Sequence, residues 1–430
     1  MKPVSAIEVR AWGQQVGAVA LDPRLGYYAF AYSPEWRRSG IELAPLTLPL
    51  TAAQEVLIFP NLPEATFHRL PGMLADALPD AFGNALIDAW MAKQGIAKNE
   101  ITTLDRLAYM GKRGVGALEF KPAHGSHTES SAPLQMKSLV EEARKLVEGN
   151  LSVDAEAAVA LANILRVGTS AGGARAKAVI AWNPETNMMR SGQFDAAPGF
   201  EHWILKFDGV GKDAELGTGA DYGRIEYAYH LMAKQAGIEM MPCRLLEEND
   251  RAHFMTRRFD REVVDGRTIK HHIQTLCAME HLDFRQRATH AYAQLFMSVA
   301  RLRLGDAANT QVFLRMAFNV MARNCDDHAK NFSFRLKQGN AWDLAPAYDV
   351  THAYNPRGEW TYQHLMSVNG KFDGITRDDL LLEGDRFQVR RPKDLLADVR
   401  AAVENWPACA KEAGLRAATT NRVAADFRLV

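Results

Sequence analysis

The residues best suited to chemistry form one short polar run, 324–331 (NCDDHAKN), between a predicted helix over Met316–Ala322 and a predicted strand over Phe332–Leu336. Asp326 and Asn331 have the spacing of the aspartate and asparagine in a kinase catalytic loop. In that chemistry the aspartate accepts the proton of the substrate hydroxyl and the asparagine binds Mg²⁺. The run therefore predicts a phosphoryl-transfer site. The alternative is a solvated loop that caps a helix.

A second carboxylate, Asp349, is expected beside this loop. Predicted strands over Phe332–Leu336 and Trp342–Leu344 would form a hairpin around Gln338–Asn340 and deliver Asp349 to the same place. An aspartate beside an asparagine supplies the hard oxygen ligands that Mg²⁺ prefers. Taken alone, Asp349 is equally typical of a turn.

A lysine, Lys206, lies inside the apolar predicted strand His202–Phe207. Burying an unpaired ammonium group is costly, so an anionic ligand or a carboxylate partner is expected. Glu226, on a predicted helix over Tyr222–Gly237, is the candidate partner, in the manner of a kinase Lys–Glu pair. The alternative places Lys206 on an edge strand, pointing to solvent.

A loop of small residues comes before the predicted strand Ala178–Trp182 and contains Ser170, Ala171, Gly172 and Gly173. Small residues let a backbone approach a polyphosphate, and free N–H groups there can hold its oxygens. By itself the loop is equally typical of a flexible turn. However, the loop, the lysine, the glutamate, the catalytic-loop pair and the last aspartate follow the order of a two-lobed kinase. Together they predict ATP-dependent phosphoryl transfer.

Composition limits the class of protein. The chain has 430 residues, and 51 basic residues balance 51 acidic ones, so no global field concentrates nucleic acid. Four cysteines lie far apart without a CxxC pair, which is typical of a reducing compartment. The N-terminus turns polar too early for a signal peptide, and no apolar stretch is long enough for a membrane span. We expect a cytoplasmic protein without membrane contact.

Hydrophobic periodicity predicts an α+β protein with a small N-terminal α+β module and a strand-rich lobe followed by a helical one. Together with the order of the motifs, this predicts that the module docks on a two-lobed protein-kinase-like domain. The predicted boundaries are 1–122 for the module, 123–137 for a linker, 138–260 for a strand-rich N-lobe and 261–430 for a helical C-lobe. The remaining predicted strands are Ile7–Trp12, Gln15–Ala20, Tyr27–Tyr32 and Ala252–Arg257. The remaining predicted helices are Leu74 to about Gln94, Leu134–Glu148, Asp154–Arg166, a run from Phe284 past Ala322, and packed helices over Asp394–Phe427.

Over nearly its whole length the chain resembles the HipA-like serine/threonine kinases, the toxins of bacterial HipBA toxin–antitoxin systems. The string Asn-x-Asp-x-His-x-Lys-Asn at 324–331 is the most specific part of the resemblance. The other segments that carry it are Leu70–Asp80, Gly111–Leu118, Ser170–Lys177, Ile204–Phe207, Arg258–Arg261 and Leu344–Asp349.

The resemblance implies roles for individual residues. Asp326 would be the catalytic base, with Asp327 as a chemically plausible neighbour that the spacing to Asn331 disfavours. His328 would contact the transferred phosphate, and Asn331 and Asp349 would hold Mg²⁺. The implied ATP-binding set is Ser170, Ala171, Gly172, Gly173, Lys206, Arg257, Phe259, His328, Asn331 and Asp349, with Arg257 and Phe259 on the hinge that meets adenine. Ser170 would also be autophosphorylated, with Thr169 as a second candidate hydroxyl, and the added charge would repel the ATP phosphates.

The family also implies partners. Its members phosphorylate aminoacyl-tRNA synthetases and bind HipB, a helix-turn-helix antitoxin. A protein substrate of that kind, a HipB-like partner and only indirect contact with DNA are therefore expected. Two alternatives stay open: a small-molecule kinase of the same fold, and a catalytically weak partner or co-repressor that works with a HipB-like antitoxin.

Overall fold

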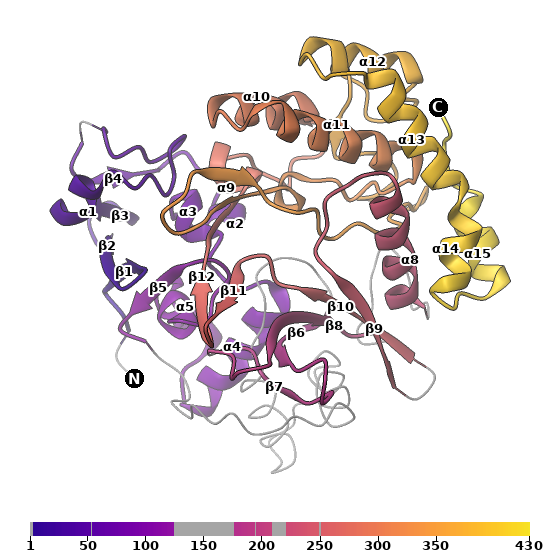
Figure 1. Cartoon of the computed structure of the whole chain (residues 1–430). Coiled ribbons are helices and arrows are strands. Elements are labelled where there is room, and N and C mark those ends of the chain that lie inside the picture. The colour runs from indigo at the N-terminus through magenta and orange to yellow at the C-terminus, as the bar shows by residue number, and fades with distance from the viewer. Residues whose placement is uncertain (1–2, 53, 124–175, 194, 209–220, 249–250) are drawn as a thin grey trace.

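Three groups of elements lie side by side in the molecule, and the N-terminal one contacts both of the others (Figure 1). The structure is a computed structural model that describes residues 3–52, 54–123, 176–193, 195–208, 221–248 and 251–430. The predicted linker beyond residue 123 and the predicted helices Leu134–Glu148 and Asp154–Arg166 lie outside the described residues. The fold is α+β, as the sequence predicted.

The N-terminal module is built on an antiparallel five-stranded sheet with the order β4-β3-β2-β1-β5. Alternate residues of β1, such as Ile7 and Val9, are fully buried, which is the period of a strand with one face on the core. The three strands predicted here are confirmed. The strands are β1 (Ala6–Ala11), β2 (Gln14–Asp22), β3 (Tyr27–Tyr32), β4 (Leu57–Ile58) and β5 (Leu118–Lys121). The helices are α1 (Pro34–Ser39), α2 (Glu64–Phe67), α3 (Gly72–Ala75), α4 (Ala81–Lys93), η1 (Lys98–Glu100) and α5 (Thr103–Met110).

The single helix predicted from Leu74 to about Gln94 is wrong, because the chain breaks between α3 and α4 at 76–80. Pro79 has no N–H to continue a helix and disfavours helical geometry in the residue before it. Asp80 then starts α4 as its N-cap and accepts the N–H of Gly83 at 2.7 Å. The break leaves a short turn, residues 76–80, between the two helices.

The N-lobe is a second antiparallel sheet, with the order β7-β6-β8-β10-β9. Its strands are β6 (Lys177–Trp182), β7 (Met189–Ser191), β8 (Glu201–Lys206), β9 (Cys243–Glu248) and β10 (Arg251–Arg257). Helix α8 (Tyr222–Gln235) contacts β9 and β10, and Gly237 follows its end with a φ of 80°. Because β8 is the middle strand, the edge-strand alternative for Lys206 is wrong.

The C-lobe is mainly helical. Its helices are α9 (Leu276–Glu280), α10 (Tyr292–Arg301), α11 (Gly305–Met321), η2 (Ala329–Asn331), α12 (Arg377–Arg386), α13 (Pro392–Glu404), α14 (Trp406–Glu412) and α15 (Ala417–Ala424). A small sheet, β13-β15-β16, carries the predicted hairpin, since β15 and β16 pair antiparallel. The short strands are β11 (Arg261–Val264), β12 (Arg267–Lys270), β13 (His272–Thr275), β14 (His290–Ala291), β15 (Ser333–Leu336), β16 (Trp342–Leu344) and β17 (Met366–Ser367).

The continuous helix predicted from Phe284 past Ala322 is also wrong, because α10 and α11 are separate. Arg303 and Gly305 adopt φ values of 56° and 81°, in the left-handed region that ends a right-handed helix. The chain turns there, and α11 packs against α10. This turn allows both helices to cover the same core.

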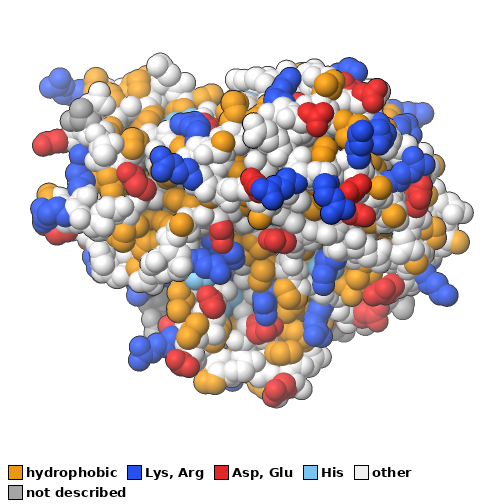
Figure 2. All heavy atoms as spheres, turned by 45° about the horizontal axis from the view of Figure 1, so that its top comes forward, with side chains coloured by type: hydrophobic (Ala, Val, Ile, Leu, Met, Phe, Trp, Pro, Cys, Tyr) orange, Lys and Arg blue, Asp and Glu red, His pale blue; other side chains and the backbone are white. Residues whose placement is uncertain are grey.

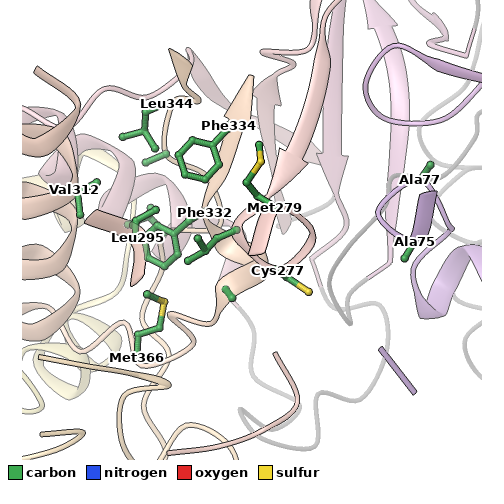
Figure 3. Packing of buried hydrophobic residues seen from close by; sticks show 14 of the residues in the cluster. Ala75, Ala77, Cys277, Met279, Leu295, Val312, Phe332, Phe334, Leu344 and Met366 are labelled. Atoms are coloured by element: carbon green, nitrogen blue, oxygen red, sulfur yellow. The ribbon is translucent and has the colours of Figure 1, made fainter. Parts of the chain in front are cut away.

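The core of the C-lobe surrounds the small sheet. Phe332 and Phe334 pack with Leu295 of α10 and Val312 of α11 (Figure 3). The four cysteines are buried and free. Among the helices of the described ranges, none is long and apolar enough to cross a membrane. Basic and acidic side chains are interspersed over the face in Figure 2, as the balanced composition implies.

Candidate active site

Lys206, Glu226 and Asp349 meet in the space between the two lobes. Lys206 ends β8, Glu226 is buried on α8, and Asp349 follows the β15–β16 hairpin. The Lys206 ammonium donates hydrogen bonds to both carboxylates. Burial alone would lower the pKa of Lys206, but Asp349 and Glu226 hold it above its ordinary value. One cation thus joins the sheet, the helix and the C-lobe.

A second lysine, Lys177, lies at this place, and no role for it was predicted from the sequence. It is the first residue of β6 and pairs in register with Lys206 on β8. Burial would raise the pKa of Asp349, but Lys206 and then Lys177 hold it well below its ordinary value. The sequence held a signal for Lys177, because this lysine begins the apolar stretch 177–182 (KAVIAW). Burying its ammonium group without a partner would be costly, as it would be for Lys206.

Asp326 lies in the loop that follows α11, near Asp349. Its side chain keeps 39% of its surface exposed, and its Oδ1 accepts the indole N–H of Trp360 at 2.8 Å. Burial raises the pKa of Asp326 above its ordinary value, as does the charge of Asp349, although the charge of His328 and the hydrogen bond from Trp360 act to lower it. Trp360 is another contact that the sequence analysis missed, and no local pattern marks it.

Asp327 has a different environment from its neighbour. Its side chain is fully buried and accepts hydrogen bonds from the Tyr292 hydroxyl at 2.8 Å, the His364 ring at 2.9 Å and the Leu365 N–H at 2.7 Å. Burial would lower the pKa of His364, but Cys325 and Asp327 raise it to about 10. Asp327 and the protonated His364 therefore form a buried ion pair that supports the loop from behind.

His328 and Asn331 are fixed by the loop itself. The His328 Nδ1 accepts the backbone N–H of Lys330 at 3.2 Å, which places the ring proton on Nε2, 3.6 Å from Asp326 Oδ1. The Asn331 side-chain amide donates to the carbonyl of Asp326 at 2.7 Å. The amide nitrogen of Asn331 is therefore used as a donor, and the amide oxygen is the acceptor atom that its side chain can offer to a ligand.

The donor set suits Mg²⁺ bound together with a polyphosphate. Magnesium in proteins is commonly held by one or two carboxylates plus waters and phosphate oxygens. Asp349 and Asn331 offer such oxygens, whereas no group of three or more His, Cys, Asp or Glu residues in the described part of the chain could hold a metal alone. The two lysines supply charges for phosphates beside them.

The hinge residues lie at the end of β10. The backbone N–H of Arg257 donates to Pro242 O at 2.9 Å, and its side chain pairs with Glu201 at 3.2 Å, at the surface. The ring of Phe259 lies 5.6 Å from that of Tyr348, the residue before Asp349. Phe259 is thus beside the cleft, while the Arg257 side chain is directed elsewhere. Thr169, Ser170, Ala171, Gly172 and Gly173 lie outside the described residues.

Comparison with known proteins gives consistent matches along the chain. Residues 7–121 match the HipA N-terminal domain, and residues 169–424 match the HipA-like C-terminal domain. A serine/threonine-protein kinase toxin HipA of Shewanella oneidensis is 21% identical over 401 residues, which cover 85% of this chain and 79% of that protein. A solved structure, the Shewanella oneidensis MR-1 HipA, HipB and operator DNA complex, contains a chain that matches with a TM-score of 0.66 and 18% identity. That match covers 97% of this chain and 94% of the other, and it shows a shared fold.

Proposed function

The chain belongs to the HipA family, and from that membership we propose that it is an ATP- and Mg²⁺-dependent serine/threonine-protein kinase. The observation that carries the proposal is the double pairing of Lys206 with Glu226 and Asp349. A lysine–glutamate pair beside a metal-binding aspartate is a requirement of protein kinases. The 18% identical solved structure supports the fold alone, so the activity rests on the site.

The chemistry needs little covalent work from the protein. Asp326 accepts the proton of a serine or threonine hydroxyl, while the hydroxyl oxygen bonds to the γ-phosphorus of ATP and the bond from that phosphorus to ADP breaks. Lys206 and Lys177 neutralise phosphate charge, and His328 lies beside Asp326 where it can contact the transferred group. Mg²⁺, held by Asn331 and Asp349, would neutralise the remaining phosphate charge when bound.

The assignment of the base to Asp326 rather than Asp327 has a structural argument. Asp327 is fully buried and accepts hydrogen bonds from three groups. The Asp326 side chain keeps 39% of its surface exposed. A base must reach the hydroxyl that it deprotonates, so the exposed neighbour fits the role.

Incubation of the chain with radiolabelled ATP, Mg²⁺ and a bacterial extract tests the activity. We expect a labelled protein band that Asp326→Asn weakens at least about 100-fold, the usual contribution of a general base. Asp398→Asn is the matched control, because it changes an exposed aspartate on α13, and this variant should label protein as the parent does. Label in small molecules alone would instead support a small-molecule kinase. No label in either fraction, with no nucleotide binding, would support a catalytically weak partner or co-repressor.

The finer parts of the proposal concern targets and regulation. We propose a translation-related protein, such as an aminoacyl-tRNA synthetase, as substrate, and autophosphorylation at Ser170 as the switch that turns the kinase off. Phosphopeptide mapping after the same incubation identifies the labelled protein and distinguishes Ser170 from Thr169. A Ser170→Ala chain should keep its activity during incubation with ATP, whereas the parent should lose it.

A HipB-like helix-turn-helix protein is the proposed partner, with DNA reached only through it. The support is the Shewanella oneidensis complex, in which a chain of the same fold is bound to HipB and operator DNA. The zero formal net charge of this chain suits indirect contact with DNA. Gel-shift measurements with the chain alone should show no DNA binding. With the antitoxin present, the DNA should shift to a complex larger than the one that the antitoxin forms by itself.

A further inference from the structure

The segment between α3 and α4, residues 76–80, carries two aspartates into the junction of the three parts of the molecule. Asp76 accepts the backbone N–H of Thr275 at 2.7 Å and its hydroxyl at 3.0 Å. Asp80 lies on the other side, with its Oδ2 at 3.7 Å from Lys177 Nζ. One short stretch of the N-terminal module therefore accepts hydrogen bonds from the C-lobe at Asp76 and forms an ion pair with the N-lobe at Asp80.

The contact between Asp80 and Lys177 is an interior one. The exposed fraction is 1% for the Asp80 side chain and 6% for that of Lys177. Buried lysines and aspartates are uncommon unless they are paired. Removing one partner of such a pair leaves an uncompensated charge in the interior, which is strongly unfavourable.

Lys177 is adjacent to the groups that would hold phosphate and metal. It pairs in register with Lys206, whose ammonium bonds Asp349. Residues directly opposite each other on antiparallel strands project to the same face of the sheet, so Lys177 lies on the face that carries Lys206. Without the Asp80 carboxylate, Lys177 would lose the charge that holds its ammonium in place beside Lys206.

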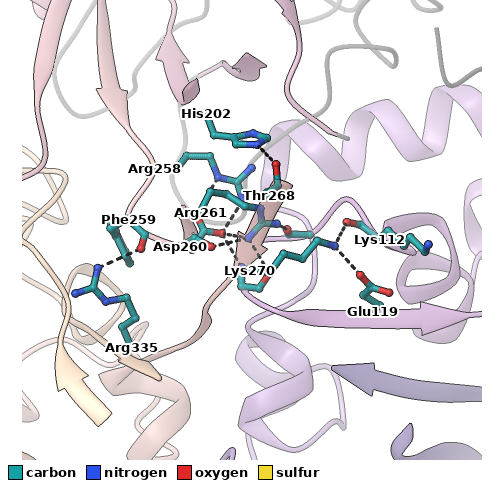
Figure 4. Close-up of polar contacts among 12 residues, drawn as sticks. Lys112, Glu119, His202, Arg258, Phe259, Asp260, Arg261, Thr268, Lys270 and Arg335 are labelled. Carbon is teal, nitrogen blue, oxygen red and sulfur yellow. Dashed lines mark hydrogen bonds and ion pairs between the residues drawn. The ribbon is translucent and has the colours of Figure 1, made fainter. Parts of the chain in front are cut away.

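The position of Asp80 is fixed by further contacts of the same module. The N–H of Gly72 donates to His281 Nε2 at 3.0 Å, so α3 is held against α9. At the hinge, the N–H of Gly116 donates to Asp260 at 2.8 Å, and Arg261 donates to Gly116 O at 2.9 Å. Figure 4 shows Asp260 and Arg261 at this contact with the module. Beside them, Lys270 donates hydrogen bonds to the carbonyl of Lys112 and to the carboxylate of Glu119. The module is thus attached on both sides of the cleft.

We propose that Asp80 is a positioning residue for Lys177, so that the N-terminal module completes the phosphate-binding site of the kinase-like cleft. The proposal rests on the proposed function, because it takes ATP with Mg²⁺ as the ligand. It assigns the N-terminal module a part in nucleotide binding that acts through Lys177.

A double-mutant cycle on nucleotide binding tests this inference in the full-length chain. The probe is a fluorescent ATP analogue with Mg²⁺, and the variants are Asp80→Asn, Lys177→Gln and the two combined. Asparagine keeps the N-cap of α4, which uses Oδ1, and removes only the charge. We expect Asp80→Asn to raise Kd at least roughly tenfold, equal to about 1.4 kcal/mol. In the Lys177→Gln background the same change should have no further effect.

Controls separate the pair from general damage. Asp88→Asn, on the same helix, removes a carboxylate that pairs with Arg106 at 2.7 Å within the module, and it should bind the probe as the parent does. Asp80→Glu keeps the charge and should bind the probe better than a folded Asp80→Asn. If the asparagine variant unfolds, Asp80→Glu is compared with the parent, whose binding it should approach. Thermal unfolding of each variant shows which chains are folded.

The outcomes are distinct. Equal weakening by Asp80→Asn in both backgrounds, or no weakening at all, overturns the inference while the proposed function stands. Binding by Asp80→Glu as poor as by a folded Asp80→Asn overturns it as well. Failure of the parent chain to bind ATP with Mg²⁺ overturns the proposed function, and the inference with it.

Discussion

The indole of Trp360 donates its N–H to the Asp326 carboxylate at 2.8 Å, which orients the proposed base from a segment beyond Asp349. We predict that Trp360→Phe moves the acid limb of the pH–rate profile upward by about one unit, because a hydrogen bond to a charged group contributes roughly 1.5–3 kcal/mol. The base works only when deprotonated, so activity is lost as the pH falls through the pKa of Asp326. Initial labelling rates from about pH 5 to 9 provide the measurement. Trp342→Phe, which removes an indole hydrogen bond to Glu42 O, should leave the acid limb in place.

The two neighbouring aspartates of the catalytic loop should respond differently to the same substitution. Asp327→Asn removes the charge opposite a protonated His364 and should lower the free energy of unfolding by about 3–5 kcal/mol. Asp326→Asn should unfold close to the parent while losing activity. Urea unfolding combined with labelling rates provides both readouts. If Asp327→Asn were stable but inactive and Asp326→Asn were active, Asp327 would be the base instead of Asp326.

The Asp327–His364 pair also predicts how stability depends on pH. The pKa of His364 is raised to about 10 in the folded chain, against about 6.5 for an ordinary histidine. Because the folded pKa is raised, the stabilisation is complete below about pH 6.5 and is lost as the pH rises towards 10, by up to about 1.4 kcal/mol per unit. Urea unfolding at pH 6.5, 8 and 9.5 measures this slope. His364→Gln should flatten it, and an unchanged slope in that variant would contradict the assignment.

Gly72 permits the close approach of α3 to α9. A Cβ at this position would lie 2.5 Å from the carbonyl oxygen of Ala278, so Gly72→Ala must separate the two helices. We predict a loss of about 1–3 kcal/mol in unfolding free energy, the usual cost of overpacking. Gly114→Ala is the control, because its Cβ would meet Met110 at an ordinary 3.8 Å. Equal stabilities of the two alanine variants would show that the α3–α9 contact can relax without cost.

Some elements were set by local patterns and others by contacts between distant segments. Alternation predicted β1 to β3, and the apolar runs predicted β6, β8 and β10, because a strand with a buried face records its period in its sequence. Periodicity failed at the two helix breaks, where Pro79 and the left-handed Arg303 interrupt continuous apolar spacing. Those turns follow from the backbone and from what each helix packs against.

The sequence by itself determined the order of the chemical groups: Lys206, Glu226, the Asp326–Asn331 loop and Asp349. Lys206 stands out in the sequence because burying a charged side chain in an apolar element is costly. Asp326 and Asn331 stand out because they have the spacing of a kinase catalytic loop. Only the tertiary structure decided that Asp327 is buried against His364 and that Lys177 is paired with Lys206. It also decided that Trp360 contacts Asp326 and that Asp80 contacts Lys177. A local pattern records which side of an element is buried, but it cannot record which distant segment covers that side.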